Sequence, residues 1–502
     1  MTLLITNVRV IGGGKNLPEV ADVYVNGDKI SAIGSFGDKK TDEVLSGEGA
    51  YLSPGFIDVN TDSDHYLSIF DHPGQEDFLR QGVTTIVGGN CGASLAPLLY
   101  GSLESIQKWT DVRNMNVGWH TLEEFFSLIE KRQLGVNFMT LIGHSTVRRA
   151  MLGEAMRDLT SNELVVFGET LRRALKEGAA GFSTGLGYVH SRQTPYAEIK
   201  FLAKIVHEYG AVYATHLRNT GEGLGDSIEE TIKIANETGA RVVVSHLLPL
   251  KGFEKEYEAA LDRIESLPRD ADFHFDLYPF DTSVIPLYAF LPLWVQNGGI
   301  EVMMSNVKDS WLQPRIVKEL PKVDPHGFVI AWASGDLTLS GRSLREMMDI
   351  YGLRDPQETL MRLMVSTSLR ASIFYKNINP ALITRGLLSK RSFVSSNAAS
   401  LSDARKEEKL ERAVSTFPKF LSLVLKEKLM PLEDAIKKVT QEPARKFNLR
   451  DRGEIREGNY ADLACFTDEG HVKFTVVNGR VAFKDGTVQT ILAGRPLRHH
   501  GY

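Results

Sequence analysis

The chain has 502 residues, a formal net charge of −5, and 42% hydrophobic and 24% charged residues. These values are ordinary for a globular enzyme, and the length allows a large domain with a second, smaller one. The acidic balance and the lack of a basic run argue against a nucleic-acid partner, because phosphate binding needs clustered Lys and Arg.

The sequence also argues against a membrane or a disulfide-rich protein. No apolar stretch approaches the roughly 20 residues that span a bilayer. The first residues lack the basic region and small-residue cleavage site of a signal peptide. Two cysteines, Cys91 and Cys465, are too few for a disulfide framework. We therefore expect a cytoplasmic protein with no membrane partner.

Both ends of the chain are predicted to be rich in β-strands. Asn26-Gly27 between two apolar runs is a strong hairpin signal. The expected strands are residues 3–5, 8–11, 23–25 and 30–33 near one end, and 461–466, 474–477 and 480–483 near the other. We expect these segments, within residues 1–53 and 445–502, to form one small β-sandwich.

The middle of the chain alternates apolar strands with helical periods. Strands are predicted at 82–87, 138–142, 241–245 and 272–277, and helices at 164–177, 199–209 and 228–238. This alternation favours an α/β fold, a (β/α)₈ barrel over 54–444, although periodicity alone does not exclude an open doubly wound sheet. Residues 280–345 do not follow this alternation of strands and helices, and they are rich in Pro, Trp and Met. They are predicted to be an insertion near the mouth of the barrel.

Two apolar runs each end in a histidine, at His216 and His246. The two positions are thirty residues apart, which is about one strand-helix-strand unit. A lone histidine at a strand end is more often a hydrogen-bonded core residue. Two of them one barrel unit apart favour metal ligation, because parallel barrels present side chains from the carboxyl ends of their strands. Neutral imidazole is a good zinc ligand.

Cys91 follows the strand predicted at 82–87 and has glycines on both sides. A buried cysteine is usually an inert, small apolar residue. Here the flanking glycines allow a sharp bend that brings the sulfur into a cavity. With His216 and His246 it completes a three-ligand set, which is what a catalytic zinc needs beside an open position.

Polar residues follow two further predicted strands. If 56–62 is a strand, Asp58, Asn60 and Asp62 point to one face. Asp62 is a candidate metal ligand or base, whereas Asn60 is a poor zinc ligand. Asn397 closes the run 393–397, predicted to be the last barrel strand, and would by itself be an unremarkable loop cap.

These residues and several longer stretches resemble the D-aminoacylase (N-acyl-D-amino-acid deacylase) branch of the amidohydrolase superfamily over nearly the whole chain. The segments that carry the resemblance are 54–58, 81–97, 143–148, 178–186, 213–219, 276–280, 341–344, 452–455, 461–463, 477–480 and 494–498.

The resemblance implies a metal-bearing (β/α)₈ barrel with a β-sandwich built from both termini and a mobile insertion over the mouth. It implies one zinc ion at Cys91, His216 and His246. The family's second, looser metal position uses a His-x-His pair on the first strand, and Asn60 and Asp62 stand there in this chain. The family's proton-carrying aspartate on the last strand corresponds to Asn397, whose amide cannot take up a proton at neutral pH. Asp62 is then the candidate replacement base, with Asp64 a weaker one.

The resemblance also implies a site for a small carboxylate substrate. Arg412, ahead of Ser415-Thr416-Phe417-Pro418, matches the family's carboxylate-binding arginine, and a guanidinium suits a carboxylate through paired hydrogen bonds. Tyr278 matches a pocket tyrosine. Lys251 lies later than the family's lysine, which follows the second histidine segment directly.

Three functions remain open on this basis. The first is zinc-dependent hydrolysis of an amide bond in an N-acyl amino acid or a related small carboxylate. The second is an inactive relative that binds or regulates, because Asn60 and Asn397 replace residues of the family's catalytic machinery. The third is a different reaction in the same pocket, such as a lyase, isomerase or cyclic-amide hydrolase reaction.

Overall fold

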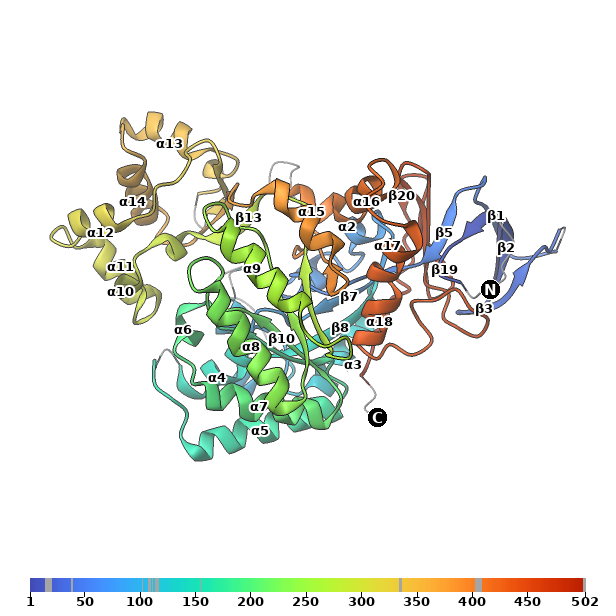
Figure 1. Ribbon diagram of the computed structural model, residues 1–502, viewed down its shortest axis with the longest axis horizontal. Helices are drawn as coiled ribbons and strands as arrows, with labels where there is room; N and C mark the ends of the chain where they lie inside the picture. The colour runs from blue at the N-terminus through green and yellow to red at the C-terminus, as the bar shows by residue number, and fades with distance from the viewer. Residues whose placement is uncertain are drawn as a thin grey trace.

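The structure is a computed structural model, and it describes residues 1–13, 20–37, 39–101, 103–106, 110, 112, 117–153, 155–333, 336–401 and 409–499. Figure 1 shows three parts: a central barrel wrapped by helices, a sheet domain at the end that holds the N-terminus, and a helical excursion at the other end. None of the helices in the described ranges combines the length and the apolar character that crossing a bilayer requires.

Eight parallel strands form a nearly closed barrel, as the sequence predicts. Each strand pairs with the next in chain order, and the last, β16, pairs with β12. Where β16 approaches β6, the Asn397 amide donates to the Asn60 carbonyl oxygen at 2.9 Å. The strands are β6 (Phe56–Asp58), β7 (Val83–Gly88), β8 (Asn137–Gly143), β9 (Gly181–Gly185), β10 (Val212–His216), β11 (Arg241–Val244), β12 (Phe273–Leu277) and β16 (Ser392–Val394).

The helices between these strands bury one apolar face against the barrel. In α5, for example, Phe167, Leu171 and Leu175 recur at helical spacing and are buried. A capping box of Thr160 and Glu163 begins this helix by pairing backbone donors that have no partner within it. The helices are α1 (Ser68–Asp71), α2 (Glu76–Leu79), α3 (Leu122–Arg132), α4 (His144–Leu152), α5 (Ser161–Lys176), α6 (Val189–Arg192), α7 (Tyr196–Glu208), α8 (Leu224–Thr238), α9 (Glu254–Glu265), α15 (Pro380–Leu388), α16 (Glu411–Leu425), α17 (Leu432–Val439) and α18 (Gln441–Lys446).

Both ends of the chain contribute to the separate sheet domain. Strand β1 pairs with β2 and β4 near its start and with β5 near its end, so it joins two groups of strands that share one apolar core. The two short strands predicted at 3–5 and 8–11 are this single strand, which carries a bulge between Ile5 and Val8. The strands are β1 (Thr2–Val10), β2 (Ala21–Asn26), β3 (Lys29–Gly34), β4 (Glu43–Ser46), β5 (Tyr51–Pro54), β17 (Leu463–Phe466), β18 (Val472–Val477), β19 (Arg480–Lys484) and β20 (Thr487–Val488).

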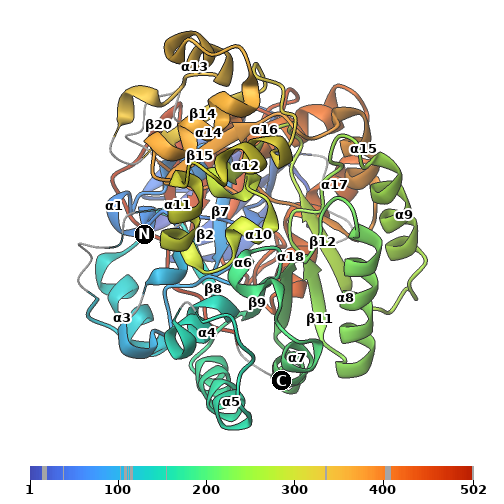
Figure 2. The same ribbon diagram turned by 90° about the vertical axis from the view of Figure 1, so that its left-hand side faces the viewer.

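The excursion has its own three-stranded sheet and its own apolar core. Figure 2 views the molecule from this side. Strand β15 pairs with both β13 and β14, so the unit extends to Tyr375, and the boundary predicted near residue 345 falls inside it. Composition could not reveal this pairing, because strand partners are distant in sequence. The elements are β13 (Ser283–Pro286), α10 (Leu293–Gln296), α11 (Gly299–Lys308), α12 (Gln313–Glu319), β14 (Phe328–Ala333), α13 (Leu344–Tyr351), α14 (Pro356–Ser366) and β15 (Ala371–Tyr375).

Candidate metal centre

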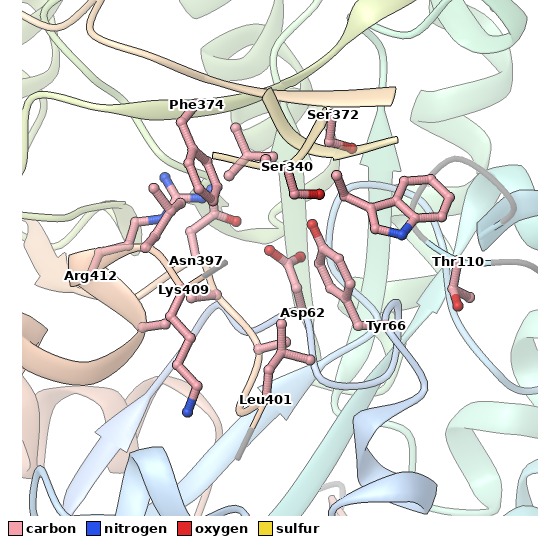
Figure 3. A pocket seen from close by; sticks show the side chains of 17 residues that line it. Asp62, Tyr66, Thr110, Ser340, Ser372, Phe374, Asn397, Leu401, Lys409 and Arg412 are labelled. Carbon is pink, nitrogen blue, oxygen red and sulfur yellow. The ribbon is translucent and has the colours of Figure 1, made fainter. Parts of the chain in front are cut away.

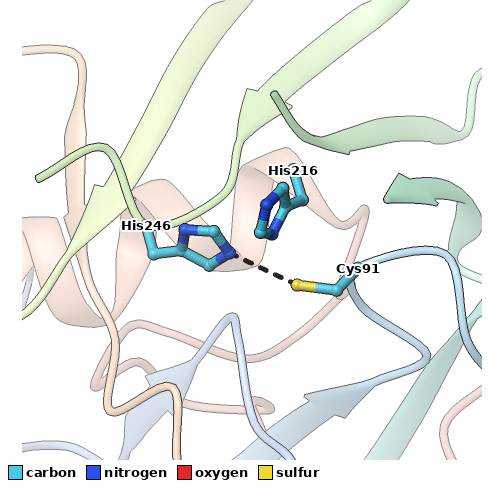
Figure 4. Close-up of side chains that lie close together, drawn as sticks. All are labelled: Cys91, His216 and His246. Atoms are coloured by element: carbon cyan, nitrogen blue, oxygen red, sulfur yellow. Dashed lines mark hydrogen bonds between the residues drawn. The ribbon is translucent and has the colours of Figure 1, made fainter. Parts of the chain in front are cut away.

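Cys91, His216 and His246 meet at the carboxyl ends of three barrel strands. Cys91 follows β7, His216 is the last residue of β10, and His246 comes two residues after β11. The Cys91 sulfur and one ring nitrogen of each histidine all lie within 4.8 Å of one another, and the Cys91 Sγ is 3.3 Å from the His246 Nε2. Figure 4 shows the sulfur and the two rings facing a common point.

The local backbone explains how these side chains reach that point. Cys91 and His246 both have a positive φ, 53° and 38°, which turns each side chain out of the line of its strand. The His246 amide donates to the Asp276 Oδ1 at 3.0 Å, which anchors the turn after β11. Gly187 leaves room for the His216 ring, because a Cβ at that position would lie 2.6 Å from its Nε2.

The electrostatic surroundings favour neutral imidazole at His246. Burial lowers the pKa of His246 to about 4, so the ring is uncharged at neutral pH. The ring of Tyr188 lies 4.7 Å from the ring of His216, centre to centre, and burial with the nearby Cys91 raises the tyrosine's pKa well above its ordinary value. Tyr188 therefore stays protonated and offers a hydroxyl, not a charge, to the pocket.

The donor set of this cluster fits a divalent metal. A thiolate and two imidazoles are the ligands that zinc prefers, with metal–sulfur distances of about 2.3 Å and metal–nitrogen distances of about 2.0 Å. Tetrahedral ligands at those distances are separated by roughly 3.5 Å. The separation of 3.3 Å between Cys91 Sγ and His246 Nε2 agrees with this value.

The first strand contributes differently from the prediction. β6 ends at Asp58, so residues 60–62 belong to the loop that follows and not to a strand. Asp58 accepts from the backbone amides of Asn60 and Ser396, at 3.3 and 3.1 Å, and burial raises its pKa to about 7. Asp58 therefore ties β6 to the segment after β16.

Asn60 bonds to a buried carboxylate of β12. Its Nδ2 lies 3.3 Å from both oxygens of Asp276, whose Oδ1 also accepts from Ser395 Oγ at 2.6 Å. Burial raises the pKa of Asp276 to about 6, while these hydrogen bonds oppose the rise. An amide at position 60 thus stabilises the ionised carboxylate that also anchors His246.

Asp62 bonds to a histidine within its own loop. His65 is fully buried; its Nδ1 lies 2.9 Å from the Asp62 Oδ1, and its Nε2 lies 3.0 Å from the carbonyl oxygen of Ala93. Burial alone would raise the pKa of Asp62, but the hydrogen bond and charge of His65 and the charge of Arg412 lower it below its ordinary value. Asp62 is therefore an ionised carboxylate at neutral pH.

Two hollows of about 360 and 290 Å³ share Asp62, Tyr66, Asn397 and Arg412 in their walls. The smaller one also contains Cys91, His216, His246 and Tyr278. The larger one lies against the excursion sheet and is lined by apolar side chains such as Trp332 and Phe374. Figure 3 shows the carboxylate of Asp62 directed into this space between Tyr66 and Asn397.

Arg412 is buried and held by an aromatic ring. Its guanidinium carbon lies 4.4 Å above the ring of Tyr278, and one terminal nitrogen donates to the Thr282 carbonyl oxygen at 3.4 Å. Its Nε has no hydrogen-bond partner among the described residues. A buried guanidinium with unused donor capacity at a pocket wall is suited to a carboxylate.

Two of the predicted positions lie elsewhere. Lys251 is exposed, its Nζ donates to the Lys376 carbonyl oxygen at 2.8 Å, and it is in the wall of neither hollow, so the structure does not bring it to the pocket as the resemblance implies. The cause is the loop after His246, where Leu247 and Leu248 take the places nearest the pocket. Asp64 accepts from the Gly89 amide at 2.6 Å, and burial raises its pKa, so it supports the Cys91 loop.

Sequence reasoning missed His65, Tyr188 and Asp276 as parts of the site. His65 had a local signal, since it closes the acidic run Asp62-Ser63-Asp64 directly after a buried strand. Asp276 had another, as a carboxylate inside a barrel strand, where a charge needs a partner. Tyr188 lies in a loop between β9 and α6 and carried no periodic signal.

Known proteins resemble this chain in sequence and in fold. Residues 376–482 match the amidohydrolase family. The chain is 28% identical over 467 residues to a D-aminoacylase of Alcaligenes xylosoxydans xylosoxydans. The matched region covers 92% of this chain and 87% of the relative.

Two solved structures extend this likeness to the fold. A D-aminoacylase structure has a TM-score of 0.81 and 27% identity, with 99% of each chain covered. D-aminoacylase is described as having a binuclear metal centre with one-metal activation and second-metal attenuation. The N-acyl-D-glutamate deacylase of Bordetella bronchiseptica, complexed with zinc and a phosphonate inhibitor, has a TM-score of 0.81 and 25% identity over 99% of both chains.

Proposed function

Because this chain is a D-aminoacylase-like member of the amidohydrolase family, we propose that it hydrolyses the amide bond of an N-acyl amino acid or a related small carboxylate. One observation carries the proposal. A metal-binding set of side chains and a buried arginine line the same hollow, so one small molecule can present an acyl carbonyl to the first and a carboxylate to the second.

Cys91, His216 and His246 would hold a single divalent ion, which we take to be zinc from the donor set. When bound, the ion supplies Lewis-acid polarisation of the acyl carbonyl and lowers the pKa of water to about 7. The neutral state of His246 favours ligation, because a metal competes with protons for the same lone pair. A single ion agrees with the one-metal activation described for D-aminoacylase.

The remaining residues bind the substrate and handle protons. Arg412 would bind the carboxylate. The ring of Tyr278 packs against the guanidinium through a cation–π contact and so fixes its orientation. Asp62 would accept the proton of the attacking water, because it is an ionised carboxylate in the wall of the same hollow. Asn397 lines the hollow as well, and its amide can donate a hydrogen bond to an anionic oxygen but cannot carry the proton.

Metal analysis of the purified protein with a hydrolysis panel of N-acyl-D- and N-acyl-L-amino acids tests the proposal. We expect about one zinc per chain and release of free amino acid from at least one series. A metal-loaded protein that turns over no member of the panel would contradict it.

A second function is favoured by the amide at position 397. A protein that keeps the metal and Arg412 but lacks a working proton acceptor would bind N-acyl amino acids without cleaving them. Calorimetric titration of the metal-loaded protein with the same panel separates the two functions, because binding without turnover supports only this one.

A further inference from the structure

His65 differs from the other buried histidines at the barrel mouth in what its two ring nitrogens face. The Nδ1 faces the Asp62 Oδ1 at 2.9 Å, and the Nε2 faces the Ala93 carbonyl oxygen at 3.0 Å. A carbonyl oxygen can only accept, so the Nε2 carries a proton. A carboxylate also accepts, so a second proton lies between Nδ1 and Oδ1.

This arrangement holds one proton more than a neutral histidine beside an ionised aspartate. The charges around it agree with an imidazolium–carboxylate pair. Asp64 Oδ2 lies 3.9 Å from the His65 Nε2 and adds negative charge on the histidine side, while the positive charge of Arg412 acts on Asp62 from the pocket side. The pKa of His65 is raised by Asp64 and Asp62 against the opposing effect of burial.

The same contacts fix the position of Asp62 relative to the metal cluster. His65 bonds to Ala93, two residues after Cys91, and Asp64 bonds to Gly89, two residues before it. The loop that carries Asp62 is thus tied on both sides of Cys91. A carboxylate held this way cannot rotate freely, and His65 engages only one of its two oxygens.

We propose that His65 is a positioning residue that keeps Asp62 ionised and aimed into the pocket, so that the Asp62–His65 pair performs the proton transfer that Asn397 cannot. The inference rests on the proposed hydrolase function for its catalytic consequence, and on the hydrogen-bond geometry for its structural content. It gives this chain a proton-transfer device built within one loop after β6.

The proton balance of the step is simple. As the water oxygen bonds to the acyl carbon, the O–H bond breaks and its proton passes to the Asp62 oxygen that His65 does not engage. The proton then passes to the departing nitrogen as the C–N bond breaks, giving a free amine and a carboxylic acid. Asp62 returns to its ionised state, and the two His65 ring protons stay in place throughout.

The first test measures the protonation state of His65 and does not depend on enzyme activity. In protein labelled with ¹⁵N-histidine, the ring-nitrogen shifts of His65, assigned by their loss in His65→Asn, report its protonation state. We expect both nitrogens to be protonated at pH 7.5 in the metal-loaded protein, and the Asp62→Asn variant to leave the ring neutral. A neutral His65 in the unaltered protein would overturn the inference, even if the protein proves to be an active hydrolase.

The second test uses two substitutions that each keep one of the two hydrogen bonds. His65→Asn places an amide donor near the Nδ1 position and keeps the bond to Asp62, whereas His65→Gln places it near the Nε2 position and keeps the bond to Ala93. We expect kcat to fall about 100-fold or more in His65→Gln and about tenfold in His65→Asn, with KM within about threefold in both. A purely structural role predicts equal losses, and that result would overturn the inference.

A matched control comes from the other end of the barrel. His274 is a partly buried histidine whose Nδ1 lies 3.4 Å from the Asp272 Oδ1, but it lies near the start of β12, away from the pocket. His274→Asn should lower the unfolding temperature to a similar degree as the two His65 variants, while kcat stays within about twofold. The unaltered protein could lack hydrolysis and still have a doubly protonated His65. That result would reject the proposed hydrolase function and support the Asp62–His65 pair.

Discussion

The two sides of the barrel mouth differ in how far they depend on distant parts of the chain. On one side, Cys91, His216 and His246 lie at or after the ends of β7, β10 and β11 and form the donor set that the resemblance implies. On the other side, Asn60, Asp62 and Asn397 come from the segments after β6 and β16 and depart from it. The first side has the donor set for a metal ion, and in the proposed hydrolase the second side would handle protons with different groups.

Metal ligation and proton transfer place different demands on this fold. Metal ligation needs three side chains whose directions are set by strand ends, and these remain. Proton transfer needs one ionised group at the right place, and a neighbouring loop can supply it. Asp62, held by His65, occupies the same hollow as the metal-binding set.

The largest expected effect comes from removing a metal ligand. Cys91→Ala should reduce bound zinc from about one ion per chain to none and lower kcat/KM by at least about 10³-fold, because several kcal/mol of transition-state stabilisation depend on the ion. Elemental analysis and kinetics measure both. Cys465→Ala, which alters the buried cysteine of β17, is the control and should keep the metal. Full zinc occupancy in Cys91→Ala would remove Cys91 from the ligand set.

Asp62→Asn should remove proton transfer and leave metal binding intact. We expect kcat to fall by about 10²- to 10⁴-fold while zinc stays bound, since the amide keeps the shape of the carboxylate but cannot take up a proton.

The double variant Asp62→Asn/Asn397→Asp sharpens this result. It should raise kcat at least about tenfold above that of Asp62→Asn, because it places a carboxylate in the same hollow, in the segment after β16. Unchanged activity in the single variant would exclude Asp62 as the base.

Arg412→Lys should affect binding more than chemistry. Lysine keeps the charge but loses the paired hydrogen bonds and the flat contact with Tyr278, so KM should rise about 10- to 100-fold with kcat changed less than about threefold. Arg385→Lys, on the exposed face of α15, is the control. A fall in kcat with KM unchanged would place Arg412 outside carboxylate binding.

The smallest effect is on stability and comes from Asp58. Its pKa is raised by burial from 3.8 to about 7, so the folded state binds a proton more tightly than the unfolded state. The stability from this group is complete at pH below about 4 and is lost as the pH rises toward 7 and above.

Asp58→Asn mimics the protonated group. The free energy of unfolding of this variant should therefore rise relative to that of the unaltered protein between pH 5 and pH 8, as measured by denaturant titration with metal content recorded at each pH. Asp71→Asn, at an exposed position, is the control. A difference that does not vary with pH would contradict the burial of a protonated Asp58.

Several features could be predicted from the sequence because their signals are local. Gly178, Gly210 and Gly239 follow helical periods, and the structure ends α5, α7 and α8 at or within two residues of each. His216 and His246 could be predicted to converge because parallel strands end at the same edge of a barrel. The nucleic-acid and localisation expectations stay predictions.

Other features could not be predicted because they depend on loops that meet in space. The position of Lys251 depends on a hydrogen bond from its backbone amide to the Asn377 carbonyl oxygen, a contact that no local pattern encodes. The extension of the excursion to Tyr375 depends on β15 pairing with strands up to about 90 residues away. The end of β6 at Asp58 follows from hydrogen bonds to Ser396, far along the chain.

The sequence by itself determined the barrel, the two-ended sheet domain and the choice of Cys91, His216 and His246 as candidate metal ligands, since strand periodicity and side-chain chemistry can be read from each residue. Only the tertiary structure decided that Asp62 has a partner. His65 faces two hydrogen-bond acceptors, the Asp62 carboxylate in its own loop and the Ala93 carbonyl oxygen in the Cys91 loop, and that pair of acceptors exists only when the two loops are packed together.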